Sequence, residues 1–208
     1  MKRMIILSAC LLLSCLAAEA QQIMYSNLKK LLSQDGDTVS TLLVERRNNY
    51  TINLMNGGDF RIGSSENSGL NRYLRSRCYA VRIDSVLYFN CRKMRYMRYR
   101  FGVCYAPGLQ VGNRYFFSAQ PLGQVASRTF AQKGNPKLGG EVGDAIDVSG
   151  LIRDRVYYEI NPETGKSDFV GIDYLKSQFK DQPLILRELE KEKNESAEVI
   201  LKYIKQLQ

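Results

Sequence analysis

Three tight-turn signals, each set between runs of strand-forming residues, constrain this chain more than any other feature. They are Asn56-Gly57-Gly58, Gly112-Asn113 and the longer loop Asn161–Gly165. Glycine reaches the positive φ angles of a tight turn without strain, and proline presets φ in a longer one. The first signal predicts a hairpin between residues 50–55 and 60–62. Because strands joined this way are antiparallel neighbours, the chain is predicted to be a mainly antiparallel β protein.

Further β-rich runs bring the expected number of strands to roughly eight to ten. Cys78–Ile83 and Val86–Cys91 are separated by Asp84-Ser85 alone, and residues 42–47 and 95–105 add others. The sheet they form is expected to be open, sandwich-like or barrel-like, and the sequence leaves these three forms open.

Helices are predicted mainly after Gly171, which makes the fold class α+β overall. Asp173 is a candidate N-cap for a helix over 174–180, and Pro183 suits the first turn of the next helix. From Ser196 onward, apolar residues recur at helical spacing and form one stripe. They are Val199, Ile200, Tyr203, Ile204 and Leu207.

The first twenty residues have the three parts of a secretory signal peptide. Lys2 and Arg3 supply the positive end, residues 4–16 form a short apolar run, and small residues at 18 and 20 favour cleavage after Ala20. The apolar run is too short to span a membrane, which needs about 20 residues. No later stretch comes close, so no transmembrane helix is expected once the signal is removed.

A second processing route is open. Leu12–Cys15 resembles the lipobox of bacterial lipoproteins, in which the cysteine is lipidated and becomes the new N-terminus. Residues 16–18 offer no polar tether of the kind such proteins usually carry, which favours simple cleavage over a lipid anchor at Cys15. Either route predicts export to the periplasm or the cell surface.

The domain organisation follows from these elements. A signal peptide over 1–20 precedes a β-rich domain over 21–172 and a helical C-terminal segment over 173–208. Residues 123–150 hold six of the sixteen glycines and show no periodicity. A long Gly-rich surface loop is expected there, and loops of this length are often functional.

The absence of histidine excludes several classes of enzyme. With no His among 208 residues, the chain cannot build a Ser-His-Asp triad, a Cys-His pair or a His-ligated zinc site. The acidic residues between 141 and 147 match no calcium loop, and Leu138–Asp144 lacks the pattern of a phosphate loop. No catalytic residue, metal ion or cofactor is therefore predicted.

Three cysteines follow the signal: Cys78, Cys91 and Cys104. If Asp84-Ser85 is a two-residue turn, Cys78 lies directly opposite Cys91 at a Cα separation of about 4.5 Å, which a disulfide tolerates. Export supplies the oxidising conditions that such a bond needs. The alternatives are a Cys78–Cys91 disulfide and two reduced, packed thiols. Cys104 is expected to be a small buried hydrophobic residue.

The most distinctive run is 92–101, where basic residues alternate with aromatic ones. Ten basic residues and one acid, Asp84, lie between Arg72 and Arg114. A field of this kind attracts anions of any sort. The alternative interpretation is a structural strand whose arginine stems cover apolar neighbours. The candidate anion-binding residues are Arg92, Lys93, Arg95, Tyr96, Arg98, Tyr99 and Arg100.

The partners of such a surface depend on the compartment. Charges interleaved with rings also suit nucleic acid, in which phosphates pair with the charges and bases stack on the rings. Export argues against nucleic acid in vivo. Acidic glycans or lipid phosphates of a bacterial envelope are therefore the expected ligands, and the sequence does not specify the oligomeric state.

Five motifs follow one another along the chain: Leu43–Arg47, Gly57-Gly58, Leu87–Lys93, Arg98–Gly102 and Gly139–Asp144. Taken in this order, they resemble an uncharacterised family of exported proteins from Bacteroidetes, classed as a domain of unknown function. The resemblance covers most of the chain after the signal, and it implies a bacterial host and a periplasmic or surface location. It implies no activity, substrate or catalytic residue.

The function expected from these observations is a non-catalytic binding or structural role at the periplasm or cell surface, with residues 92–100 as the contact face. One alternative is a small hydrolase that acts on glycan or peptidoglycan through two facing carboxylates about 5 to 10 Å apart. Another is a subunit of a surface assembly, with the C-terminal apolar stripe as its contact.

Overall fold

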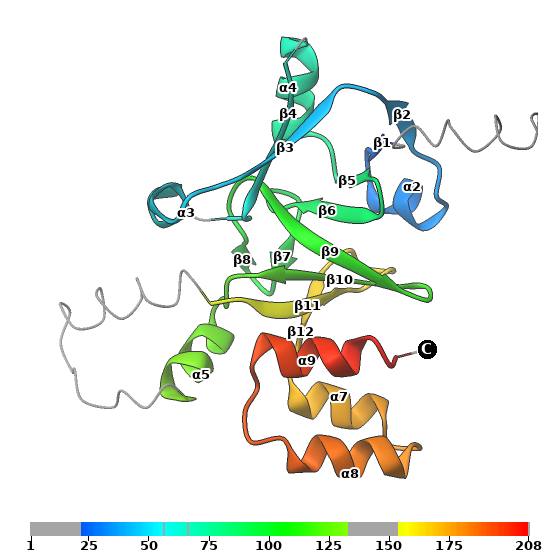
Figure 1. Ribbon diagram of the computed structural model, residues 1–208, viewed down its shortest axis with the longest axis vertical. Helices are drawn as coiled ribbons and strands as arrows, with labels where there is room; N and C mark the ends of the chain where they lie inside the picture. The colour runs from blue at the N-terminus through cyan, green and yellow to red at the C-terminus, as the bar shows by residue number, and fades with distance from the viewer. Residues whose placement is uncertain (1–21, 56, 66, 133–153, 208) are drawn as a thin grey trace, which may run out of the picture.

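Antiparallel strands build most of this protein. The computed structural model describes residues 22–55, 57–65, 67–132 and 154–207, so the predicted signal peptide and the lipidation alternative at Cys15 lie outside the described residues. Ten strands form one sheet in the order β12-β11-β10-β9-β6-β5-β1-β2, with β4 and β3 branching from β9, and β7 pairs with β8 apart from it (Figure 1). The sheet is open and does not close into a barrel. The predicted α+β class, mainly antiparallel with late helices, is confirmed.

The elements are bounded as follows. The strands are β1 (Gln22–Tyr25), β2 (Asp37–Val39), β3 (Leu42–Arg46), β4 (Phe60–Ser64), β5 (Ala80–Ile83), β6 (Val86–Asn90), β7 (Arg95–Tyr96), β8 (Tyr99–Arg100), β9 (Tyr105–Val111), β10 (Arg114–Ala119), β11 (Val156–Ile160) and β12 (Ser167–Val170). The helices are α2 (Leu28–Leu32), α3 (Asn49–Met55), α4 (Ser68–Ser76), α5 (Gln124–Gln132), α7 (Ile172–Gln178), α8 (Pro183–Lys191) and α9 (Ala197–Ile204). Within the described residues, no helix is both long and apolar enough to cross a bilayer.

Three predicted turns join the strands that they were expected to join. Asp84-Ser85 connects β5 to β6, Gly112-Asn113 connects β9 to β10, and 161–165 connects β11 to β12. Asp84, Gly112 and Gly165 have φ angles of 55°, 56° and 65°. This left-handed region is open to glycine and is tolerated by aspartate, so turn chemistry fixed these hairpins locally.

The predicted hairpin around Gly57-Gly58 is wrong. Residues 49–55 form α3 instead of a strand, and β4 pairs with β3. The glycines are required for a different reason: a Cβ at Gly58 would lie 2.1 Å from the carbonyl carbon of Tyr105, and Gly57 has a φ of 97°. The glycine pair therefore lies where two backbone segments cross closely. In the sequence, a glycine pair in this role looks the same as a glycine pair in a turn.

The predicted Cys78–Cys91 disulfide is absent, although β5 and β6 pair in the predicted register. The strands part just before the two cysteines, because the side-chain amide of Asn90 donates to the carbonyl oxygens of Cys78 (2.8 Å) and Leu74 (2.9 Å). Both thiols are free and buried, and they belong to different core clusters. The second alternative, two packed thiols, is the one observed.

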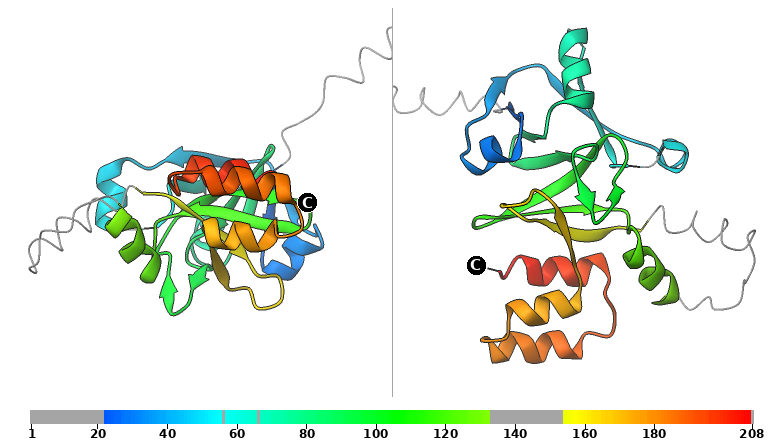
Figure 2. Two further views of the ribbon diagram at one scale, coloured as in Figure 1. Left: turned by 90° about the horizontal axis from the view of Figure 1, so that it is seen from below. Right: turned by 180° about the vertical axis from the view of Figure 1, so that it is seen from behind.

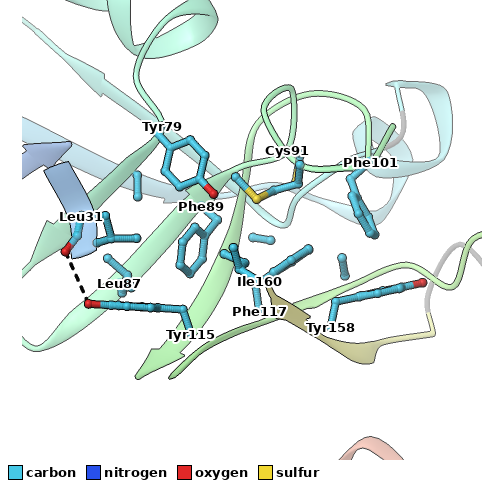
Figure 3. Close-up of a cluster of buried hydrophobic side chains, with 14 of the residues drawn as sticks. Leu31, Tyr79, Leu87, Phe89, Cys91, Phe101, Tyr115, Phe117, Tyr158 and Ile160 are labelled. Carbon is cyan, nitrogen blue, oxygen red and sulfur yellow. Dashed lines mark hydrogen bonds between the residues drawn. The ribbon is translucent and has the colours of Figure 1, made fainter. Parts of the chain in front are cut away.

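The main core lies on one face of the central strands and is strongly aromatic (Figure 3). Tyr158 stacks on Phe117 with ring centroids 5.6 Å apart, and Phe101 packs edge-on against both rings. The Tyr115 hydroxyl donates to the carbonyl oxygen of Leu31, which ties α2 to the sheet (Figure 3). Aromatic pairs of this geometry contribute about 0.5–1.5 kcal/mol beyond their burial.

The C-terminal helices pack against β10–β12, the strands nearest to them (Figure 1). Ser196 caps α9 by accepting from the Val199 amide at 3.3 Å, and Pro183 occupies the first turn of α8 as predicted. The predicted apolar stripe points into this cluster, which includes Phe116 of β10. Because the stripe covers its own sheet, it does not serve as the contact of a larger assembly. Its buried members are Ile200, Tyr203, Ile204 and Leu207.

The expected Gly-rich loop begins as a helix. Residues 124–132 form α5, so that part of the prediction is wrong. The reason is local, because Gln124–Gln132 contains no glycine or proline and is free to form two helical turns. The remainder of the predicted loop, from 133 to 150, lies outside the described residues.

Candidate functional site

The predicted anion-binding run forms a small hairpin of its own, which projects from the main sheet (Figure 2). In this basic hairpin, Arg95–Arg100, Arg95 lies opposite Arg100 and Tyr96 lies opposite Tyr99. Met97 turns the chain with a φ of 51°. Cross-strand partners share a face of a ribbon and successive residues alternate between faces. The hairpin therefore presents Arg95 and Arg100 on one side and Tyr96 and Tyr99 on the other, with Arg98 in the turn.

The two tyrosines attach the basic hairpin to the body of the protein. The Tyr96 ring lies 5.3 Å from the Tyr158 ring, between centroids, and Tyr99 packs against Gly123, where a Cβ would come within 2.6 Å of its ring. Burial raises the pKa of Tyr96, and the charge of nearby Asp168 adds to the effect. Both rings are half-buried and act as anchors, so they do not form the free stacking platform that nucleic acid would use.

The arginines of the basic hairpin are exposed. None of Arg95, Arg98 and Arg100 forms an ion pair within the described part of the chain. The guanidinium of Arg98 lies 5.2 Å from the centroid of the Tyr99 ring and donates to its hydroxyl at 3.1 Å. Like charges placed directly opposite on a ribbon cost up to about 1 kcal/mol, and a bound anion would remove that cost.

The rest of the basic stretch does not share this surface. Arg114 is paired with Glu159, at 2.6 Å between Nε and Oε1, and also donates to Tyr174. Arg82 donates to Gln110 at 3.0 Å. The excess of positive charge counted along the sequence is thus divided among separate places in the fold.

Arg92 and Lys93 lie in the turn after β6, and both are exposed. Arg92 faces a pocket of about 770 Å³ that the sequence did not predict. We call it the arginine pocket. Its residues come from four parts of the chain: β3 and its end, β4 and its end, α4, and the two segments 90–92 and 103–105. They are Leu43, Glu45, Arg47, Arg61, Ile62, Gly63, Ser64, Ser65, Asn71, Arg75, Asn90, Arg92, Val103, Cys104 and Tyr105.

The arginine pocket carries four arginines and a single carboxylate, that of Glu45. The hydrolase alternative needs two facing carboxylates, and this pocket does not supply them. Within the described residues, no cluster of three or more His, Cys, Asp or Glu side chains is placed to hold a metal ion. The chemistry that the pocket can offer is therefore recognition of negative charge.

The cysteines differ in their access to this pocket. Burial raises the pKa of Cys78 to about 11 and that of Cys91 to about 12, so both remain neutral thiols, and a nucleophilic cysteine needs the opposite shift. Cys104 is partly exposed in the pocket wall, with a φ of 66°, where a fully buried residue was expected.

The spacing of the arginines in the sequence does not predict that they line one pocket. Arg61 comes from β4, Arg75 from α4 and Arg92 from the turn after β6, and the strand pairing that joins them is long-range. Alternation of basic and aromatic residues did indicate Arg95–Arg100 as a candidate surface, because the whole pattern lies within six consecutive residues. The sequence predicted a strand there, however, and the structure has a separate two-stranded hairpin.

Fold and surface together define a class: an open, mainly antiparallel β protein with a C-terminal helical layer, an exposed basic hairpin and a pocket rich in arginine. Comparison with protein families is more specific, because a family model described as a family of unknown function, DUF6563, matches residues 23–208. The chain belongs to that family. Comparisons with curated proteins and with solved structures found no match.

Proposed function

We propose that this is an exported, non-catalytic binding protein of the bacterial periplasm or cell surface whose basic hairpin contacts anionic ligands. The observation that carries the proposal is the cross-strand pair of Arg95 and Arg100, together with Arg98 in the turn of the same hairpin, all exposed and without an ion pair in the described residues. Guanidiniums form strong charge-assisted hydrogen bonds with phosphate and carboxylate groups, and three of them on one small ribbon can engage several such groups of a polyanion.

Export rests on the sequence. Residues 1–20 have the composition of a secretory signal, and the lipid anchor at Cys15 is the alternative route to the same compartment. The ligand class follows from that location: acidic glycans and lipid phosphates are the polyanions that an envelope protein meets. A non-catalytic role is favoured by the high thiol pKa values and by the lone carboxylate in the arginine pocket.

The test is a binding panel with the protein that begins at Gln21. It covers an acidic polysaccharide, a neutral polysaccharide, vesicles with anionic lipid phosphates and vesicles of zwitterionic lipid, each across a salt series. A hairpin variant with Arg95→Gln, Arg98→Gln and Arg100→Gln is measured beside the native protein. Charge-assisted hydrogen bonds contribute about 1.5–3 kcal/mol each, so loss of three should weaken binding by at least about a hundredfold.

The outcomes separate recognition from a general field. Binding to one class of polyanion that survives moderate salt and is lost in the hairpin variant supports the proposal. Weak binding to every polyanion that disappears with salt, or binding that is the same in the variant, contradicts it, because exposed charges more than a Debye length apart are screened.

A further inference from the structure

The arginine pocket has walls that the fold holds in place without a ligand. The Asn71 side chain clamps Ser64 of β4 through two bonds of 2.7 Å, one from the Ser64 amide and one to the Ser64 carbonyl oxygen. Asn90 donates to Leu74 and Cys78, and the Tyr105 hydroxyl donates to the Leu74 carbonyl oxygen at 2.7 Å. Because these walls are already ordered, binding of a ligand costs less conformational entropy of the protein.

Backbone geometry aims two of the cations into the pocket. Arg75 follows Asn71 by four residues on α4, so both lie on the same face of that helix. Arg61 and Gly63 are two residues apart on β4 and therefore lie on the same face of that strand. At Gly63 a Cβ would lie 2.9 Å from the Asn71 amide oxygen. The glycine therefore admits Asn71 and leaves that part of the pocket free of a side chain.

The pocket holds more positive charge than its own groups neutralise. Arg47 is committed to the fold, because it donates to the carbonyl oxygens of Gly58 (2.7 Å) and Thr51 (2.6 Å). Arg61, Arg75 and Arg92 are exposed and form no ion pair within the ranges that the structure describes. Three guanidiniums that converge on one concave space create a field that favours an anion.

The remaining lining describes the other part of the ligand. Glu45 lies opposite Arg61 in the β3–β4 register and offers a carboxylate that can accept from hydroxyl groups. Leu43 and Val103 supply apolar contact. The volume of about 770 Å³ lies within the range of pockets that bind small organic molecules.

We propose that the arginine pocket binds a small polyhydroxylated anion, a sugar that carries a phosphate or a carboxylate. Arg61, Arg75 and Arg92 hold the anionic group, Glu45 accepts from hydroxyls, and the apolar wall lies along the carbon skeleton. The site goes beyond the function proposed for the basic hairpin, since no residue of Arg95–Arg100 lines it.

The first measurement is calorimetry with glucose 6-phosphate and glucuronate as probes, and with glucose and inorganic phosphate as controls. We expect one of the two sugar anions to bind at least tenfold more tightly than either control. The probe that binds identifies the anionic group that the pocket recognises, phosphate or carboxylate. Binding by neither probe, or equal binding of glucose, overturns the proposal.

Cys104 provides a second readout that locates the ligand. It lines the pocket and is partly exposed, whereas Cys78 and Cys91 are buried. The bound sugar anion should slow the alkylation of Cys104 by iodoacetamide. The rate is measured by mass spectrometry of the labelled peptide. Binding that leaves this rate unchanged would place the ligand elsewhere and overturn the assignment.

Variants separate this site from the basic hairpin. Arg75→Gln and Arg92→Gln should each weaken binding of the sugar anion at least tenfold, while their melting temperatures stay near that of the native protein because both side chains are exposed. Arg72→Gln is the matched control, because Arg72 is exposed on α4 and does not line the pocket; this variant should bind as the native protein does. The hairpin variant should also keep its binding of the sugar anion. Loss of polyanion binding by the basic hairpin can therefore be distinguished from loss of sugar-anion binding by the arginine pocket. Unchanged binding in Arg75→Gln and Arg92→Gln would contradict the proposal.

Discussion

At the scale of single residues, two small groups decide how the segments around the arginine pocket meet. Gly58 lets the chain before β4 pass the start of β9, and its amide donates to the Val103 carbonyl oxygen at 2.8 Å. Asn90 keeps its backbone bond to Tyr79, and its side-chain amide donates to the carbonyl oxygens of Cys78 and Leu74 where the β5–β6 pairing ends, next to Cys78 and Cys91. The sequence predicted a turn at the first position, which is wrong, and at the second it left a disulfide and two packed thiols as alternatives. Local patterns do not decide either case, because the contacts that do so join separate segments of the chain.

Gly58→Ala should destabilise the protein strongly. The added Cβ would lie 2.1 Å from Tyr105 backbone atoms, and overpacking of a fixed crossing typically costs about 1–3 kcal/mol or more. Urea unfolding followed by circular dichroism measures the change. Gly112→Ala is a useful comparison, because its Cβ would meet nothing within 4 Å and it carries only the strain of a φ of 56°. Equal losses in the two variants would show that the crossing at Gly58 is not tight.

Buried Cys78 should make the protein less stable at alkaline pH. Burial raises its pKa to about 11 from an ordinary value near 9, so between these two pH values the unfolded chain loses the proton while the folded chain keeps it. Stability contributed by the neutral thiol is complete below pH 9 and falls as pH rises, by about 1.4 kcal/mol per pH unit.

The measurement is the free energy of unfolding at several pH values from 8 to 11. In Cys78→Ala the slope over pH 9 to 11 should be shallower by that amount, whatever the variant loses at neutral pH through its cavity. Cys104→Ser is the control, because Cys104 is partly exposed. Identical slopes in the native protein and Cys78→Ala would contradict the assignment.

At the scale of elements, local signals predicted what local forces determine. The turns at 84–85, 112–113 and 161–165 specified their hairpins, and the helical spacing after Ser196 specified α9 and its buried face. The strand predicted for 50–55 is wrong although Tyr50, Thr51 and Ile52 favour strands. Asn48 accepts from the Thr51 amide at 2.8 Å, a capping contact that favours the start of α3.

The C-terminal helices should unfold together with the sheet, because they share one core with β10–β12. Leu175→Ala, at a fully buried position in α7, should cost about 2–5 kcal/mol. Leu184→Ala in α8 is the matched control, because 77% of Leu184 is exposed and the change should be near neutral. The check is urea unfolding monitored by tyrosine fluorescence and circular dichroism. A small loss in Leu175→Ala, or separate transitions by the two probes, would show that the helices are an independent unit.

At the scale of the whole molecule, charge illustrates how far a sequence can be interpreted. The basic stretch between Arg72 and Arg114 predicted one cationic surface, and the fold divides it among an ion pair at Arg114, the basic hairpin and the arginine pocket. Arg61 lies outside that stretch and completes the pocket. A charge count identifies an attraction for anions, but strand pairing over long distances decides where the charges meet.

The account centres on recognition by the basic hairpin, and the most direct test compares two variants of equal net charge. The hairpin variant, which lacks three positive charges, is compared with a helix variant that lacks three others at exposed positions on the C-terminal helical layer. The helix changes are Lys180→Gln, Arg187→Gln and Lys191→Gln. The dissociation constant for the preferred polyanion is measured for both at the same ionic strength. We predict a loss of at least about a hundredfold in the hairpin variant and less than about threefold in the helix variant. Equal losses in the two would show that net charge, and not the basic hairpin, binds the anion.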